Sequence, residues 1–171
     1  MAAIFKREFT SFFSSAIAYV VLSVYFVFSS AFMFWYCLTY NTANLSPIFT
    51  SMLIITAIVI PVSTMKLFSE ERKQRTEQLL FTAPVRFTGV VLGKFFASLT
   101  MYLLGMSVTL VYFLVMCAFR VPDVAVFAGN FLGLLLLGAA LCAIGIFISA
   151  LTESQVIAAV GSLAIGMFLL F

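Results

Sequence analysis

Residues 14–38, SSAIAYVVLSVYFVFSSAFMFWYCL, contain no charged side chain. A helix rises about 1.5 Å per residue, so roughly 20 apolar residues cross a bilayer core of about 30 Å. Lys6 and Arg7 precede the run, as in a secretory signal, but the run is longer than a signal core and no small-residue cleavage site follows it. We therefore expect a retained transmembrane helix here.

The composition of the whole chain also indicates a membrane environment. Of its 171 residues, 64% are hydrophobic and 9% are charged, and phenylalanine alone accounts for 21. A soluble domain is about half apolar and about a quarter charged, so this amount of apolar surface requires a bilayer. The sequence predicts an integral membrane protein.

Residue types that carry chemistry are scarce. The chain has no histidine, which is the commonest general base and metal ligand. The cysteines, Cys37, Cys117 and Cys142, lie in separate apolar runs without a CxxC spacing. The net charge of +3 does not favour nucleic-acid binding. We expect no catalytic residue, no metal site and no cofactor bound by this chain, and the lack of charge deep in any run argues against an intramembrane enzyme.

Further apolar runs, separated by polar segments, predict the rest of the fold. They occupy residues 47–67, 95–119, 124–151 and 154–171. The predicted class is all-α: a single polytopic helical membrane domain, residues 1–171, with five visible spans. The last run is short for a span and ends on apolar residues, so we expect a sixth helix beyond it in a complete chain.

Residues 2–13 have a pattern of their own. Phe5, Phe9 and Phe12 or Phe13 fall on one helical face, whereas Lys6 and Arg7 lie elsewhere. This pattern favours an amphipathic helix in the membrane surface. The alternative is that these residues simply begin the first span.

The basic residues predict the orientation of the chain. Basic residues in short loops mark the cytoplasmic side of a membrane. Lys6 and Arg7 precede the first span, and most other basic residues lie between the second and third spans, whereas Arg120 falls on the opposite side. We therefore expect a cytoplasmic N-terminus and a cytoplasmic loop at residues 68–94.

Within that loop, residues 69–84 read SEERKQRTEQLLFTAP and concentrate charge in a chain that has little. Ser69 is a candidate helix N-cap, and the acids that follow it suit the first turn of a helix. Glu71 and Arg75 are spaced for an ion pair, and Pro84 ends the helix. A loop that only fixes topology needs none of these features, although a solvated topological loop is the simpler alternative. We expect a docking helix, with contacts from Glu70, Glu71, Arg72, Arg75, Thr76, Glu77, Leu79 and Leu80.

The stretch PVSTMKLFSEERKQRTEQLLFTAPV, residues 61–85, resembles the second-helix end and coupling loop of permease subunits of type-2 ABC exporters. It is most similar to permeases of the gliding-motility and copper-enzyme-maturation group. Arg75 stands where a glycine is common and Gln78 where a glutamate is common, so the role of that glutamate does not carry over. The matching residues are Pro61, Thr64, Met65, Lys66, Glu70, Glu71, Arg72, Thr76, Leu79, Leu80, Pro84, Gly93 and Lys94.

The resemblance implies a permease subunit that is not itself an enzyme. In such exporters the loop between the second and third helices lies in a cleft of a separate ATP-binding subunit, which holds ATP and magnesium. The resemblance also implies six helices, a second permease subunit and a bacterial inner membrane. The alternative function is a membrane scaffold that recruits a cytoplasmic partner through residues 69–84.

One segment looks like a nucleotide site and is not. Residues 89–95, GVVLGKF, resemble a phosphate-binding loop, but the spacing is one residue short and Phe95 replaces the hydroxyl residue. We expect a glycine bend and an anchoring lysine, Lys94, at the membrane surface instead. The chain would then depend on an ATPase from another subunit.

Polar and small residues inside the runs complete the set of candidates. Hydroxyls of the second run could line a pathway or could bond their own helix, and its proline could act as a hinge. Small residues four apart allow helices to approach closely, within the subunit or across a dimer. The pathway or hinge candidates are Ser51, Thr56, Pro61 and Thr64. The packing candidates are Gly129, Gly133, Ala158, Ser162 and Gly166.

Overall fold

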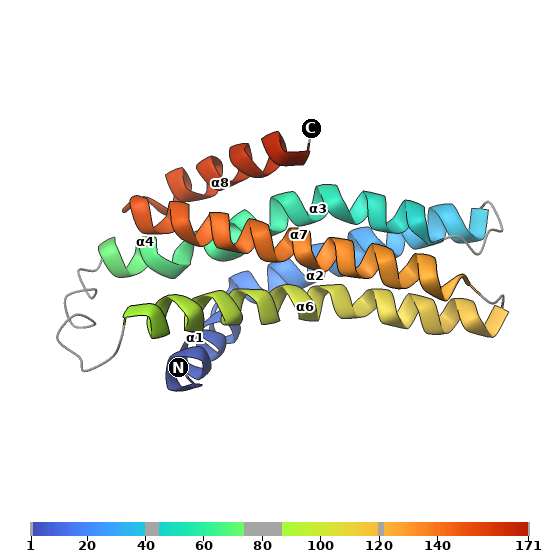
Figure 1. Cartoon of the computed structure of the whole chain (residues 1–171), viewed down its shortest axis with the longest axis horizontal. Helices are drawn as coiled ribbons and strands as arrows, with labels where there is room; N and C mark the ends of the chain where they lie inside the picture. The colour runs from blue at the N-terminus through green and yellow to red at the C-terminus, as the bar shows by residue number, and fades with distance from the viewer. Residues whose placement is uncertain (1, 40–44, 74–86, 120–121, 171) are drawn as a thin grey trace.

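The computed structural model describes residues 2–39, 45–73, 87–119 and 122–170 (Figure 1). Within these ranges the chain is helical and has no strand, which confirms the predicted all-α class. Four helices among the described residues are long and apolar enough to cross a membrane: Ala16–Tyr36, Ser46–Ser69, Thr88–Ala118 and Val124–Leu151. A fifth apolar helix, Gln155–Leu170, is shorter. The protein is a polytopic helical membrane protein.

The first two helices are divided at Ser15. Helix α1 covers Ala2–Ser14 and helix α2 covers Ala16–Met33. Ser15 has an extended backbone, and its Oγ accepts a hydrogen bond from the N–H of Ile17 at 3.3 Å, so it caps α2. A short π-helix, η1 (Phe34–Leu38), continues α2 to the end of the bundle that lies away from α1. The cap makes α1 a helix distinct from the first span.

The next two helices are joined by a single residue. Helix α3 covers Ser46–Thr64 and contains Pro61, and α4 covers Lys66–Lys73 after a turn at Met65. Helix α3 is the most buried of the four candidate spans, because α2, α7 and α8 all pack against it. It forms the centre of the bundle.

The last three helices are α6 (Phe87–Phe119), α7 (Val124–Leu151) and α8 (Gln155–Leu170). Asp123 caps α7, since its carboxylate accepts from the N–H groups of Ala125 and Val126. Helix α6 begins well before residue 95, where we expected the third span to start. It runs as one helix through Gly89 and Gly93, so the expectation of a glycine bend was wrong.

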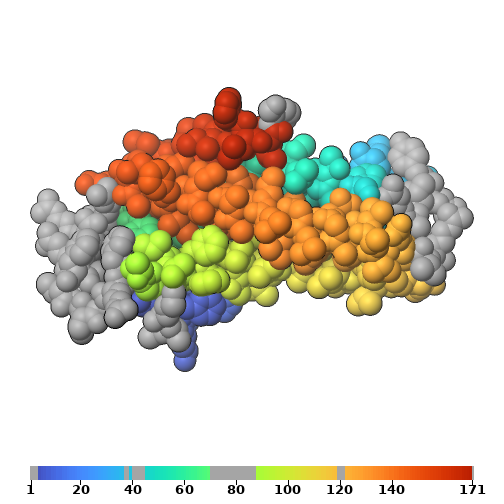
Figure 2. Space-filling view, viewed as in Figure 1, coloured from blue at the N-terminus to red at the C-terminus, as the bar shows by residue number. Residues whose placement is uncertain are grey.

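The long helices lie side by side and alternate in direction (Figure 1). Helices α1 and α4, the start of α6 and the end of α7 meet at one end, which we call the α4 end. Helix α8 leaves that end along α3 and α7. In the space-filling view α7 crosses the visible face between α6 and α8 (Figure 2). Segments far apart in the sequence are therefore brought together at the α4 end.

Two glycines of α7 allow it to approach its neighbours closely. A Cβ atom at Gly138 would overlap the ring of Tyr102, and one at Gly145 would overlap the hydroxyl of Thr64. Tyr102 is buried and donates a hydrogen bond to the carbonyl of Leu134 at 2.8 Å, so its ring cannot easily move aside. These two glycines set the spacing of α7 against α6 and α3.

The packing residues named from the sequence occupy two different environments. A Cβ atom added at Gly129 or Gly133 would meet nothing within 4 Å, and both glycines are exposed on this chain. Ala158, Ser162 and Gly166 form the buried face of α8. A Cβ atom at Gly166 would lie 3.2 Å from Leu141 of α7. The α8 stripe therefore packs inside the subunit.

Replacing Gly138 with alanine tests the close approach of α6 and α7. We expect Gly138→Ala to destabilise the protein by about 1–3 kcal/mol, because overpacking forces a rotamer or backbone shift. Gly133→Ala is the matched control on the same helix and should be neutral or slightly stabilising, since alanine favours a helix. Thermal unfolding in detergent measures both. Equal melting temperatures for the two variants would contradict the packing described for Tyr102.

Candidate functional site

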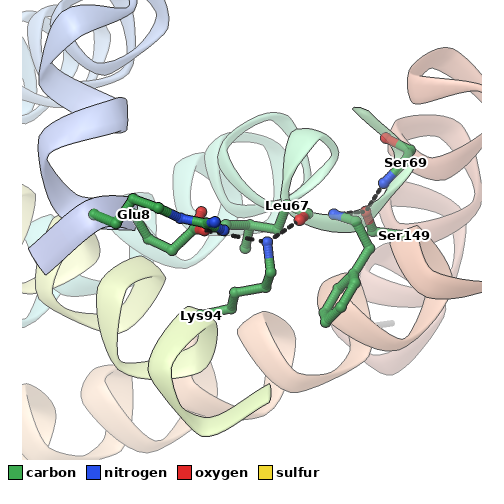
Figure 3. A network of polar contacts seen from close by, with 7 residues as sticks. Glu8, Leu67, Ser69, Lys94 and Ser149 are labelled. Atoms are coloured by element: carbon green, nitrogen blue, oxygen red, sulfur yellow. Dashed lines mark hydrogen bonds and ion pairs between the residues drawn. The ribbon is translucent and has the colours of Figure 1, made fainter. Parts of the chain in front are cut away.

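Lys94 is the most deeply buried charged residue that the structure describes, with 1% of its surface exposed. Its ammonium donates a hydrogen bond to the carbonyl of Leu67 in α4 and lies 3.4 Å from Oε1 of Glu8 in α1 (Figure 3). It also lies 4.8 Å from the centre of the Phe68 ring, a cation–π distance. One side chain of α6 thus joins α1 and α4.

Glu8 is shared by two cations. Its side chain is 11% exposed, and the same Oε1 atom that faces Lys94 lies 2.6 Å from the guanidinium of Arg7. Arg7 itself is more than half exposed. A buried charge is tolerated only where its partners satisfy it, so Glu8 compensates the Lys94 charge on the inside and is itself supported from outside by Arg7.

Ser149 of α7 supplies the hydrogen-bond partners that the start of α4 needs. Its Oγ accepts from the N–H groups of Phe68 and Ser69 at 3.1 and 3.2 Å and donates to the carbonyl of Met65 at 3.0 Å. The first N–H groups of a helix have no partner within it. Ser149 therefore caps α4 from another helix (Figure 3).

Ser69 does not have the capping role expected from the sequence. It lies inside α4, is fully buried and donates its hydroxyl to the carbonyl of Met65. The helix begins earlier, at Lys66, because the turn at Met65 follows α3 directly. The ammonium of Lys66 in turn donates to Ser15 Oγ at 3.2 Å, so α4 also contacts the junction of α1 and α2.

A family model described as ABC-2 family transporter protein matches residues 2–171. The chain belongs to the ABC-2 family. No curated protein and no solved structure matches it. The match covers nearly the whole chain and confirms the resemblance of residues 61–85 to type-2 ABC permeases, whereas the similarity to the gliding-motility and copper-enzyme-maturation group stays a prediction.

In this ABC-2 protein the residues predicted to dock a partner lie at and beyond α4. Glu70, Glu71 and Arg72 are in the helix, and their side chains fall outside what the structure describes. The remaining docking candidates lie outside the described residues; these candidates are Arg75, Thr76, Glu77, Leu79 and Leu80. Gln78 and Pro84 also lie outside the described residues. Docking through these side chains stays a prediction.

The pathway and hinge candidates of α3 contact other parts of the same chain. Thr56 is fully buried, and its hydroxyl lies 3.1 Å from that of Tyr25 in α2. The hydroxyls of Ser51 and Thr64 bond carbonyls of their own helix, and Pro61 is buried inside α3. Their hydrogen bonds are thus made within this subunit. A pathway or hinge role for them stays a prediction.

Sequence reasoning missed the contacts of Glu8 and Ser149. A signal for Glu8 was present: it falls on the helical face of Phe5 and Phe12, and an acid among apolar residues needs a cation nearby. Ser149 gave no such signal, because serines are common in membrane helices and usually bond their own backbone. Among the described residues no group of three or more His, Cys, Asp or Glu side chains could hold a metal ion.

Removing the hydroxyl of Ser149 should loosen α4. We expect Ser149→Ala to lower the free energy of unfolding by about 1–3 kcal/mol and to speed amide exchange at residues 66–69, because buried partners lose their hydrogen bonds. Ser162→Ala is the control: Ser162 is buried too, but its hydroxyl bonds a carbonyl of its own helix at 2.7 Å. Unchanged exchange in Ser149→Ala would show that α4 does not depend on this cap.

Proposed function

We propose that this ABC-2 family protein is the permease subunit of an ATP-driven exporter whose ATP-binding subunit is a separate chain. The family match supports a membrane component of a transporter. The observation that carries the proposal is the attachment of α4, which is tied to α1 and α6 through Lys94 and to α7 through Ser149. A helix held in this way can pass a displacement to the membrane helices.

The proposed mechanism follows from that attachment. The partner subunit binds ATP and magnesium, and closure of two such subunits displaces α4 together with the segment that follows it. Glu70, Glu71 and Arg72 would contact the partner, as would Arg75, Thr76, Glu77, Leu79 and Leu80. Because the contacts of α4 are buried and hydrogen-bonded, movement of α4 shifts the ends of α6 and α7 rather than breaking away from them. Two permease subunits would form the pathway.

We further propose that the α4 end faces the cytoplasm and that the protein lies in a bacterial inner membrane. Lys6, Lys66 and Lys94 all lie at the α4 end. Positive charge gathers on the cytoplasmic side of membrane proteins, which supports this orientation. An ATP-binding partner must also lie on the side where ATP is available.

Purification of the tagged full-length protein in mild detergent tests the function. We expect an ATP-binding protein to copurify, and we expect Glu71→Lys and Arg72→Glu to reduce its binding or its ATP turnover in the complex by about tenfold, as charge reversal at an interface does. Glu153→Lys reverses an exposed charge between α7 and α8 and should leave both unchanged. Intact protein without a nucleotide-binding partner would favour the scaffold alternative.

Cysteine labelling tests the orientation. In a variant that lacks Cys37, Cys117 and Cys142, single cysteines at exposed Asp123 and exposed Glu153 probe opposite ends of α7. An impermeant maleimide added to intact cells should label the Asp123→Cys protein, whereas Glu153→Cys should react only after the cells are opened. The reverse labelling pattern would invert the proposed topology.

A further inference from the structure

Helix α1 is held against the bundle by a defined seam. Ile4, Glu8 and Phe12 follow one another at intervals of four residues, and Glu8 and Phe12 are buried. A Cβ atom at Gly93 would lie 3.0 Å from Ile4 Cγ2, so the absence of a side chain at Gly93 lets α1 approach α6. The next residue of α6 is Lys94, which meets Glu8 one turn further along α1.

An adjoining stripe of α1 carries a row of phenylalanines, two of which, Phe5 and Phe13, also pack against the buried core of the bundle. Phe5 and Phe9 stack with ring centres 5.8 Å apart, and Phe9 lies 5.0 Å from Phe13, all three being half-buried. Lys6 and Arg7 are exposed. Helix α1 therefore contacts the bundle through apolar rings as well as through the charged contact to Lys94, which an anchor that only lay in the bilayer surface would not need.

We propose that Lys94 is a positioning residue that locks α1 to α4, so that the two helices move as one body when the partner subunit displaces α4. This inference rests on the proposed function. The ammonium group has three donors, and they reach Leu67 of α4 and Glu8 of α1 from a third helix between them. The Phe68 ring beside the ammonium adds a second contact with α4.

The two halves of this lock can be separated by mutation. Glu8→Gln keeps the shape of the side chain and removes the charge that faces Lys94, but leaves the hydrogen bond from Lys94 to Leu67. Lys94→Met removes both contacts and keeps an unbranched apolar side chain of similar length. Lys6→Met is the matched control, because Lys6 is an exposed lysine on the same helix as Glu8.

Hydrogen exchange of the full chain in lipid nanodiscs tests the lock without a partner. We expect Glu8→Gln to speed exchange in residues 2–14 about tenfold or more while residues 66–73 stay near wild type, because losing one member of a buried ion pair is costly. Lys94→Met should speed exchange in both segments. The double variant, Glu8→Gln with Lys94→Met, should exchange no faster than Lys94→Met alone, because the contact is already lost. Exchange in Lys6→Met should match that of the wild type. Unchanged exchange in α1 of Glu8→Gln would overturn the proposal, whatever Lys94→Met shows.

Joint movement is tested on the complex with its copurified ATP-binding protein. Between the nucleotide-free and vanadate-trapped states, exchange should change in both α1 and α4 of the wild type and of Lys6→Met. In Glu8→Gln it should change in α4 alone, with the partner still bound. A change in α1 that persists in Glu8→Gln, or a wild-type α1 that does not change, would overturn the proposal.

The two proposals fail in different ways. If no ATP-binding protein copurifies with the wild type, the proposed function fails, while exchange in nanodiscs still decides whether Lys94 locks α1 to α4. If the Lys94→Met protein does not insert into the membrane, Glu8→Gln, which is nearly isosteric, still tests the lock. An exchange rate in α1 of Glu8→Gln equal to that of the wild type would by itself refute the lock.

Discussion

The ammonium group of Lys94 lies inside the protein, where a carboxylate, a backbone carbonyl and an aromatic ring replace its water. A charge in such a place is tolerated only where its partners satisfy it. That requirement fixes α1 through Glu8 and α4 through Leu67 in relation to α6. Gly93 makes the arrangement possible, because no side chain there keeps α1 at a distance. The geometry of the α4 end follows from satisfying this one buried cation.

The middle of the bundle is held by neutral groups instead. The hydroxyls of Tyr25 and Thr56 meet across α2 and α3, Tyr102 donates to a carbonyl of α7, and the hydroxyls of Ser29 and Tyr112 lie 2.9 Å apart. Neutral hydrogen bonds position helices without placing charge near the bilayer centre, where it is expensive. Among the described residues the charged side chains lie near the ends of the helices, most of them at the end that carries α4 and Asp123 at the opposite end, and close packing at glycines spaces the middle.

The sequence allowed the helices to be predicted far better than their contacts. Uninterrupted apolar runs require helices by length alone, and the runs at residues 14–38 and 124–151 correspond to α2 with η1 and to α7. Helix α6 begins at Phe87, ahead of the apolar run at residue 95, and the sequence does not show that Lys94 lies beside Glu8, a residue distant in the chain. Small-residue spacing drew attention to Gly129 and Gly133, whereas Gly138 and Gly145 make the close contacts. The same spacing did identify the buried face of α8, but in α7 tertiary packing selects glycines that the spacing does not single out.

The described part of helix α4 covers 8 residues, and a segment of that length is not stable as a helix alone in water, where helices need about 12–15 residues even with favourable sequences. Its start is capped by Ser149 of α7, its Leu67 carbonyl is held by Lys94 of α6, and Lys66 bonds the junction of α1 and α2. The helix therefore exists because of its neighbours, and its conformation cannot be separated from theirs. A force on α4 must either unfold it or move the ends of the helices that hold it. Because unfolding would leave buried N–H groups, a carbonyl and a buried cation without partners, movement of the bundle is the less costly response.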